Sequence, residues 1–360
     1  MGQSFSASRS GFDRMPCRAS RRRTLGLLLV AVALLFPQAC RRPGESAGGL
    51  KKVTIGIQVS PAMTLLMVAK DKGFFAHEGL DVELKQFTAG KFALQAFFAN
   101  SIDYAVSGEV PVCLAALGGN QSRVVAQVVD HTVDEVRVVA RDDASMRSNA
   151  DPAAYFKARK RKLATSFGGG PEFFTYNFLK HYGIGPSQVE LLSQRPEDMP
   201  VSLATKSVDA VSIFDPFAFL AERQLGPQAV TYRASNLYSE LYVLVSHPRQ
   251  VDADPATIQA ILRALVQAQQ YTAAHSDEAK QILQGYTKLD PSVIDGIWGS
   301  FDFHIGLTPA LPADWNAEAQ WAKDTGKVTP GTPSPDFSSF IDARFLRAVR
   351  PESVKLQESP

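Results

Sequence analysis

The chain has 360 residues, of which 45% are hydrophobic and 21% charged, and this balance fits a soluble globular protein of two domains. Its formal net charge of +2 comes from the first forty residues, where six arginines face one aspartate. The remainder carries 32 basic and 35 acidic residues, a net charge of −3, so nucleic-acid binding is not expected.

Residues 1–40 are predicted to form an export signal. Three consecutive arginines at residues 21–23 precede an apolar run at 25–36. That run is shorter than the ~20 residues that a membrane-spanning helix needs. The segment 20–25 also resembles a twin-arginine signal, so both the general secretory route and the twin-arginine route stay open. Translation from Met1 or from Met15 stays open as well.

Cys40 is a candidate for lipidation, because it follows Ala39 at the end of the apolar run, as in a bacterial lipoprotein signal. Cleavage nearby without lipid is the alternative. Residues 41–50 are predicted to be a tether rich in Pro, Gly and Ser. Cys17 also lies in the leader, which leaves Cys113 in the folded part and excludes a disulfide framework or a cysteine-based metal site there.

From residue 51 onward, short apolar strands alternate with helices, the pattern of a parallel sheet covered by helices. The first group has predicted strands at residues 53–57, 81–84, 102–106 and 123–129, with helices at 63–70, 90–100 and 110–117. The second group has predicted strands at 136–140, 163–165, 189–192 and 210–214, with helices at 171–181 and 200–205. The strand 241–245 is predicted to return the chain to the first group, followed by helices at 255–273, 276–286, 291–301, 315–321 and 338–349.

Two crossings between these groups, near residues 136–140 and 241–245, predict two domains joined by a hinge. The predicted limits are 51–139 and 243–350 for a discontinuous domain one, 140–242 for domain two, and 351–360 for a frayed tail. A single continuous doubly wound sheet is the alternative. In both cases a ligand is expected where loops meet at the carboxyl ends of parallel strands.

Several phrases resemble the nitrate/sulfonate/taurine type of ABC-transporter substrate-binding protein, whose fold group also contains thiamine-pyrimidine binders and synthases. They lie at residues 53–56, 69–82, 99–105, 160–165, 208–217 and 340–346, and the resemblance covers about residues 51–348. It implies an α/β periplasmic-binding-protein fold of type II, with two hinge crossovers and the ligand in the interdomain cleft. It also implies an exported monomer in the periplasm or at the cell surface, a small-molecule solute, a permease partner in the inner membrane and no cofactor.

The candidate ligand-binding residues follow strand ends on the two expected walls of the cleft. They are Gln58, Ser60, Ser107, Gly108, Glu109 and His131 on the first wall, and Gly169, Gly170, Glu172, Phe173 and Asp215 on the second. The exposed amides of the turn 166–172 suit an anion or a carbonyl oxygen, with a plain tight turn as the alternative. Glu109 and Asp215 suit an amine, amidine or amino-heterocycle, or either residue caps the helix after it. Together with Glu172, these acids favour a nitrogenous or aromatic solute over nitrate, and a sulfonate-like solute stays open.

An enzyme on the same fold is the alternative function, because the resembling group includes a desulfinase with a cysteine nucleophile in the first cleft loop and a pyrimidine synthase with a Cys-rich motif. Here the loop 58–61 has no cysteine, and Cys113 lies in an apolar helix, so no catalytic residue is predicted. No His/Asp pair occurs at metal-ligand spacing, so no metal site is expected. An exported sensor or adhesion lipoprotein is a third alternative.

Overall fold

The computed structural model describes residues 49–142 and 151–356. The predicted export signal, Cys40 and most of the predicted tether lie outside these residues, as do residues 357–360. Within the described ranges, none of the helices combines the length and the apolar character required to cross a membrane.

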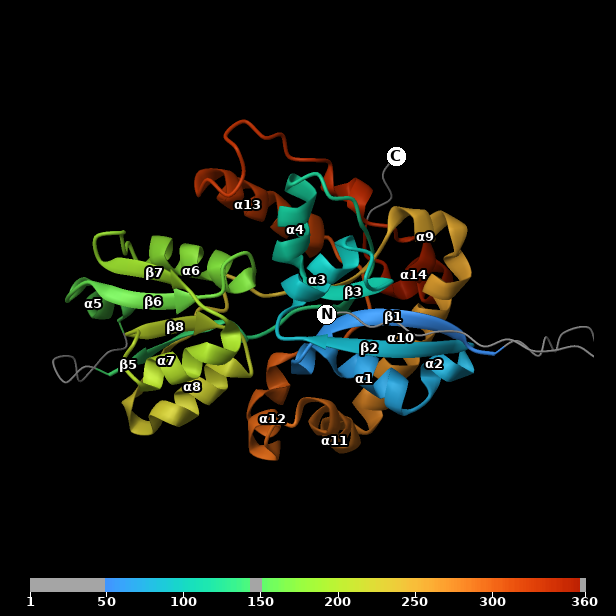
Figure 1. The fold of residues 1–360 in the computed structure, drawn as a ribbon, viewed down its shortest axis with the longest axis horizontal. Helices are drawn as coiled ribbons and strands as arrows, with labels where there is room; N and C mark the ends of the chain where they lie inside the picture. The colour runs from blue at the N-terminus through green and yellow to red at the C-terminus, as the bar shows by residue number, and fades with distance from the viewer. Residues whose placement is uncertain (1–48, 143–150, 357–360) are drawn as a thin grey trace, which may run out of the picture. The chain divides into compact units, whose positions relative to one another are not determined.

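Five strands form the first sheet: β1 (Lys51–Gln58), β2 (Leu80–Phe87), β3 (Tyr104–Gly108), β4 (Arg123–Val129) and β10 (Tyr242–Ser246). Their order is β2-β1-β3-β10-β4. Figure 1 labels β1, β2 and β3 of this sheet. β1 is parallel to β2 and β3, whereas β10 is antiparallel to β3 and β4. The late strand β10 is therefore inserted between two early strands.

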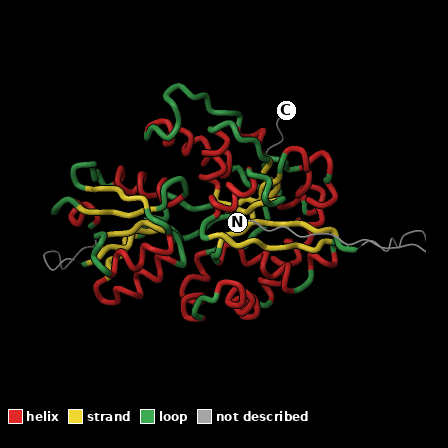
Figure 2. Tube along the Cα trace, viewed as in Figure 1, coloured by secondary structure: helices red, strands yellow, loops and turns green. Residues whose placement is uncertain are grey.

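Five further strands form the second sheet: β5 (Arg137–Arg141), β6 (Arg161–Thr165), β7 (Val189–Ser193), β8 (Ala210–Ile213) and β9 (Ala229–Tyr232). Their order is β7-β6-β8-β5-β9, and β5 is antiparallel to β8 and β9. The two sheets are separate groups of strands in Figure 2. A single continuous sheet, the alternative left open by the sequence, is excluded.

Helices cover both sheets. Those that follow strands of the first sheet are α1 (Thr64–Asp71), α2 (Phe74–His77), α3 (Gly90–Phe98), α4 (Glu109–Leu117), α9 (Pro248–Ala253), α10 (Pro255–Ala274), α11 (Ser276–Thr287), α12 (Pro291–Ile297), α13 (Ala310–Asp324) and α14 (Arg344–Val349). Those within the second group are α5 (Pro152–Lys157), α6 (Gly170–His181), α7 (Met199–Ala204) and α8 (Phe217–Leu225). The helix α10 illustrates how sequence determines burial, because Ile258, Ile261, Leu262 and Leu265 recur at intervals of three or four residues and are all fully buried.

The chain passes between the sheets twice, through residues 130–136 and 233–241. These two crossing segments are hydrogen-bonded to each other, because the Thr132 amide donates to Ser239 Oγ (2.9 Å) and the Ser239 hydroxyl donates to the Thr132 carbonyl (2.7 Å). Each crossing leads directly into the antiparallel strand of the sheet that it enters, β5 or β10. The predicted domain limits at 139/140 and 242/243 fall inside these two strands and stay a prediction.

The helix predicted near the C-terminus is wrong, and the described part of the predicted tail, residues 351–356, contains a 3₁₀ turn and a backbone bridge. The helix predicted at 338–349 is a 3₁₀ turn (Phe337–Phe340) followed by α14, and between them Ile341 makes a parallel bridge with Val124. The tail predicted to fray from residue 351 contains a 3₁₀ turn (Pro351–Ser353), and Val354 bridges Leu307. Backbone pairing with distant segments stabilises both regions, and a local pattern does not reveal such pairing.

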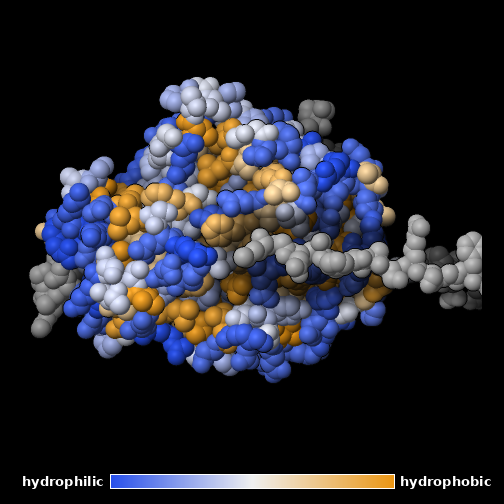
Figure 3. Space-filling view, viewed as in Figure 1, coloured by the Kyte–Doolittle hydropathy of each residue, from blue (hydrophilic) through white to orange (hydrophobic). Residues whose placement is uncertain are grey.

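Each sheet has its own hydrophobic core, and the two cores interlock. Phe173 of α6 packs into the core of the first sheet, where its ring lies 5.6 Å from that of Tyr238 and 5.2 Å from that of Trp321. Ala89, which precedes α3, belongs in turn to the core of the second sheet. On the face viewed in Figure 3, hydrophilic residues surround smaller apolar areas.

Candidate functional site

A small cavity of about 20 Å³ lies where the carboxyl ends of both sets of parallel strands meet. Its lining comes from the first sheet and its loops (Gln58, Ala89, Gly90, Lys91, Gly108, Pro111), from the second (Ser166, Gly169, Gly170, Pro171, Phe214), and from one residue of a crossing segment, Glu240. A volume of this size holds about one water molecule. The cavity is thus a narrow space between the two sheets.

Gln58, the last residue of β1, links two parts of the first wall. Its Oε1 accepts a hydrogen bond from the Gly90 amide at the start of α3 (2.9 Å), and its Nε2 donates to Tyr242 Oη (3.1 Å). The Tyr242 hydroxyl in turn donates to Glu135 Oε1 (2.8 Å). Because all of these atoms are buried, the network fixes Gln58 against the cavity.

Two glycines permit the close approach of the walls. A Cβ built on Gly108 would overlap Glu240 Oε1, and a Cβ built on Gly170 would overlap Tyr238 Oη and lie 3.0 Å from Glu240 Cδ. Gly108 ends β3 of the first sheet, and Gly170 begins α6 above the second. A larger residue at either position would require Glu240 or Tyr238 to move, so the carboxyl group of Glu240 lies close to both walls.

Glu109 lies behind this cavity and is fully buried. Its Oε1 accepts from Tyr238 Oη (2.6 Å) and its Oε2 from the Leu241 amide (2.8 Å), both in the second crossing segment. Burial raises the pKa of Glu109 from its ordinary 4.5 to about 8. Gly108 is the N-cap of α4, and Glu109 is the first residue inside the helix.

Glu135 and Glu240 are buried acids that strand-end reasoning missed. Glu135 is 0% exposed and Glu240 5%, and one carboxyl oxygen of each has no hydrogen-bond partner. Burial raises the pKa of both groups well above the ordinary value, and each acid's negative neighbours raise it further. Both residues precede a strand, and the missed signal was that β5 and β10 run antiparallel. The amino end of β10 therefore lies beside Gly108, since Tyr242 pairs with that residue.

Asp215 is engaged inside the second domain. Its Oδ2 accepts from Arg137 Nη1 (2.8 Å), and its Oδ1 accepts from the Phe219 amide (3.1 Å) in the first turn of α8. Arg137 also binds Glu222 through Nε (2.8 Å), and Asp215 is only 1% exposed. The helix-capping alternative thus describes its geometry, and Asp215 is absent from the cavity lining.

Glu172 closes the glycine-rich turn. Its Oε2 accepts from the Gly168 amide (2.7 Å), and its Oε1 pairs with Lys327 Nζ (2.5 Å) from the loop after α13. Ser60 caps a 3₁₀ turn by accepting from the Ala62 amide (3.1 Å). Neither residue lines the cavity, and Phe173 lies instead in the aromatic cluster described above.

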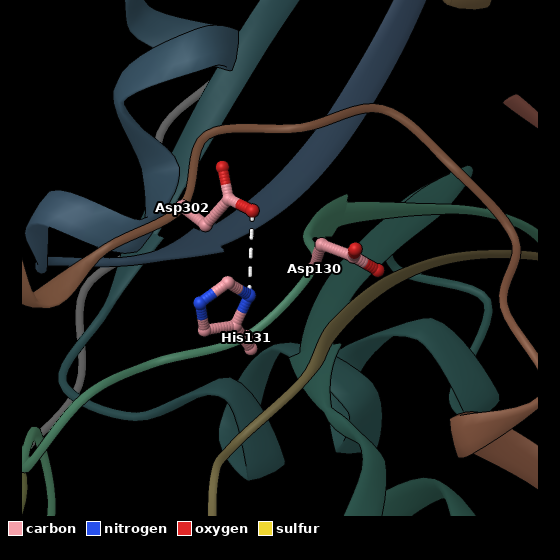
Figure 4. Close-up of side chains that lie close together, drawn as sticks. All are labelled: Asp130, His131 and Asp302. Atoms are coloured by element: carbon pink, nitrogen blue, oxygen red, sulfur yellow. Dashed lines mark ion pairs between the residues drawn. The ribbon is translucent and has the colours of Figure 1, made fainter.

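His131 lies in the first crossing segment and faces Asp302, with 3.3 Å between Nδ1 and Oδ2 (Figure 4). Asp130 completes a group whose ligand atoms lie within 4.8 Å of one another. The fold brings Asp302 to this point from far along the chain, so spacing in the sequence did not reveal the group. Because His131 and Asp302 are exposed, and exposed acids often cluster without a metal, no metal function is inferred.

Of the eleven predicted residues, Gln58, Gly108, Gly169 and Gly170 line the cavity, and Ser107 is buried directly beneath Gly90. Besides Glu240, the sequence reasoning did not select Gly90, Lys91 or Ser166 as contacts. Lys91 Nζ donates to Ser166 Oγ (2.9 Å) and to the Phe167 carbonyl (2.7 Å), which joins α3 to the glycine-rich turn of the other wall.

This architecture, with two sheets exchanging crossing segments around one cleft, is that of the periplasmic binding proteins. In structural comparison the chain is similar to the periplasmic aliphatic sulphonate binding protein SsuA from Escherichia coli, with a TM-score of 0.69, 18% identity, and coverage of 81% of this chain and 97% of that one. It is also similar to the periplasmic nitrate-binding protein NrtA from Synechocystis PCC 6803, with a TM-score of 0.68, 17% identity, and coverage of 84% and 89%.

Residues 46–285 match the NMT1-like family, and the chain belongs to that family. In sequence it is 25% identical, over 278 residues, to a Bacillus subtilis (strain 168) protein named as an aliphatic sulfonates-binding protein. That match covers 75% of this chain and 81% of the relative. The fold class and the family resemblance predicted from the sequence are therefore confirmed.

Proposed function

We propose that this chain is the extracytoplasmic solute-binding component of an ABC importer and that it captures a small organic solute between its two sheets. The observation that carries the proposal is the cavity lined from both sheets and from a crossing segment. Membership of the NMT1-like family and the names of the relatives support the same function. Sites between domains joined by a hinge are typical of proteins that close around a ligand.

Closure is part of the proposal, because a cavity of about 20 Å³ is too small for an organic solute. The solute then enters only when the sheets separate. Two polar contacts hold the walls together around the cleft: Lys91 with Ser166 and Phe167, and Lys327 with Glu172. A solute that touches both walls stabilises the closed form over the open one.

The residues predicted for the two walls have different roles in the proposal. Gln58, Gly108, Gly169 and Gly170 are proposed to contact the solute, and Ser107 supports the wall by packing beneath Gly90. Asp215, Glu172, Ser60, Phe173 and His131 have partners inside the protein, and we assign them structural roles.

The proposed partners are a permease in the membrane and the solute, with the protein acting as a monomer exported to the periplasm or cell surface and anchored by lipid on Cys40. Among the described residues, Cys113 is a poor candidate for a catalytic nucleophile. Cys113 is fully buried, and burial raises its pKa, which disfavours the nucleophilic thiolate.

Small-angle scattering of the protein before and after removal of any solute carried through a gentle purification tests the proposal. The solute should compact the protein and be recovered chemically unchanged. Lys327→Met should shift the empty protein toward the open form by about fivefold, the effect of losing about 1 kcal/mol from one ion pair. Lys323→Met, which removes only a contact to Ser334, is the control. Tight binding without compaction, or conversion of the solute, would refute the proposal.

A further inference from the structure

The wall of the closed cleft buries three carboxyl groups whose ionised forms no neighbouring cation among the described residues balances. Glu240 lines the cavity, and Glu135 and Glu109 lie close enough behind it to raise its pKa by their charge. One carboxyl oxygen of Glu240 and one of Glu135 lack a hydrogen-bond partner. Burying an ionised carboxylate is costly unless a donor or a cation meets it.

No cation of the described residues meets this need. Within residues 49–142 and 151–356, neither an ion pair nor a hydrogen bond joins the carboxyl group of Glu109, Glu135 or Glu240 to a lysine or arginine, and Arg137 Nη1 donates to Glu135 only at its backbone carbonyl (3.4 Å). Lys91 borders the cavity, but its ammonium group already donates to Ser166 and Phe167. Glu240 therefore lines the cavity with one carboxyl oxygen unpartnered among the described residues.

A metal ion does not fit this arrangement. A metal needs ligand atoms a few ångströms apart, and among the described residues the group that meets a 4.8 Å limit is Asp130, His131 and Asp302, away from the cavity. Of the three glutamates, Glu240 lines the cavity, and the other two are buried behind it. A protonated nitrogen suits this arrangement, because its N–H groups can donate to a single carboxylate.

We propose that the solute carries a protonated nitrogen, as in an amine, amidine or guanidine, and that Glu240 receives it, with Glu135 and Glu109 supporting the charge from behind. Gly108 and Gly170 hold the carboxylate between the walls, so the nitrogen meets Glu240 only as the cleft closes. This inference rests on the proposed solute-binding function and specifies its ligand class.

Titration calorimetry with propylamine, propanesulfonate and aminopropanesulfonate tests the inference, because these probes share one three-carbon chain. The two probes that contain nitrogen should bind, and propanesulfonate should not. Glu240→Gln should weaken their binding by about 10- to 100-fold, the range for a lost hydrogen bond to a charged group. Glu190→Gln, at an exposed position of β7, is the matched control and should bind as the parent does.

Mass spectrometry of the solute that co-purifies with the full chain extends the test to ligands larger than the three-carbon probes. A solute with a basic nitrogen supports the inference, whether or not it also carries an anion. An anionic solute without such a nitrogen overturns the inference and leaves the proposed function standing. Unchanged binding by Glu240→Gln also overturns the inference. Glutamine resembles the neutral, protonated form of Glu240, and unchanged binding would mean that this neutral form binds an anionic solute. If no solute co-purifies and no probe binds, the proposed function fails together with the inference.

If Glu240→Gln unfolds, Glu135→Gln provides the second variant. It keeps the shape of the buried network while removing one ionisable group. Its binding of the nitrogen probes should weaken less than that of Glu240→Gln, since Glu135 lies behind the contact. Thermal melting of both empty variants shows whether a loss of binding reflects a loss of fold.

Discussion

Glu109→Gln should stabilise the empty protein at neutral pH, and the gain should vanish in acid. Burial raises the folded-state pKa of Glu109 from 4.5 to about 8. Between these two pH values the folded protein keeps a proton that the unfolded chain has released. The free energy of unfolding of the parent therefore falls as pH rises from about 4.5 to about 8, and this contribution is constant above that range.

The magnitude follows from the pKa difference. Each pKa unit corresponds to about 1.4 kcal/mol, so at pH 7 the raised pKa costs the folded parent about 3 kcal/mol. The glutamine variant avoids this cost. It loses the bond from the Leu241 amide to Oε2, because an amide nitrogen cannot accept it, at about 1 kcal/mol. The net gain is about 2 kcal/mol at pH 7, and below about pH 4.5 the variant is less stable by about 1 kcal/mol.

Urea denaturation of parent and variant over a series of pH values measures both quantities. The difference between the two proteins should grow with pH by at most about 1.4 kcal/mol per unit. Glu190→Gln should follow the parent throughout, because its side chain is exposed. Parallel pH curves for parent and Glu109→Gln would show that Glu109 is ionised in the folded protein and would refute the reasoning.

Two other substitutions test separate parts of the proposal. Gly108→Ala should weaken solute binding at least tenfold in calorimetry, because the added Cβ overlaps Glu240 Oε1 in the closed form. The melting midpoint of this variant should change little if the cleft opens to relieve the overlap. A normal affinity for the solute would contradict the close approach of Gly108 to Glu240. Cys40→Ser should release the protein from the membrane fraction and remove the acyl mass from its N-terminus, and an unchanged distribution after cell fractionation would rule out the lipid anchor.

The predicted contacts that line the cavity came from one rule, that ligands bind where parallel strands end. Gln58 ends β1, Gly108 ends β3, and Gly169 follows β6, and each strand is apolar enough to recognise without a structure. The same rule misses Glu240 and Glu135. Each precedes a strand, and it reaches the shared edge only because that strand runs antiparallel to its neighbours.

Partners of buried charges were equally invisible in the sequence. Asp215 looked like a free carboxylate at a strand end, but the pairing of Arg137 with Ile213 brings a guanidinium to it from the neighbouring strand. Conversely, Glu109 looked like a helix cap or a ligand contact, and its partners lie in the crossing segment about 130 residues away, at Tyr238 and Leu241. Strand register determines which side chains meet in this way. Register cannot be read from a local sequence pattern, because it depends on the complete fold.

The position of the acids on the crossing segments has a consequence for closure. Glu135 and Glu240 precede the strands that enter the two sheets, so separating the sheets and exposing the cleft returns their carboxyl groups to water. The closed, empty form must bear the cost of burying them, either as charges or as bound protons. In the proposed closure, the open form would avoid that cost, and the empty protein would be biased toward it. A cationic solute removes the penalty only in the closed form, and this difference in interaction is what a ligand requires to shift a conformational equilibrium. The same groups would thus select the solute and couple its binding to closure.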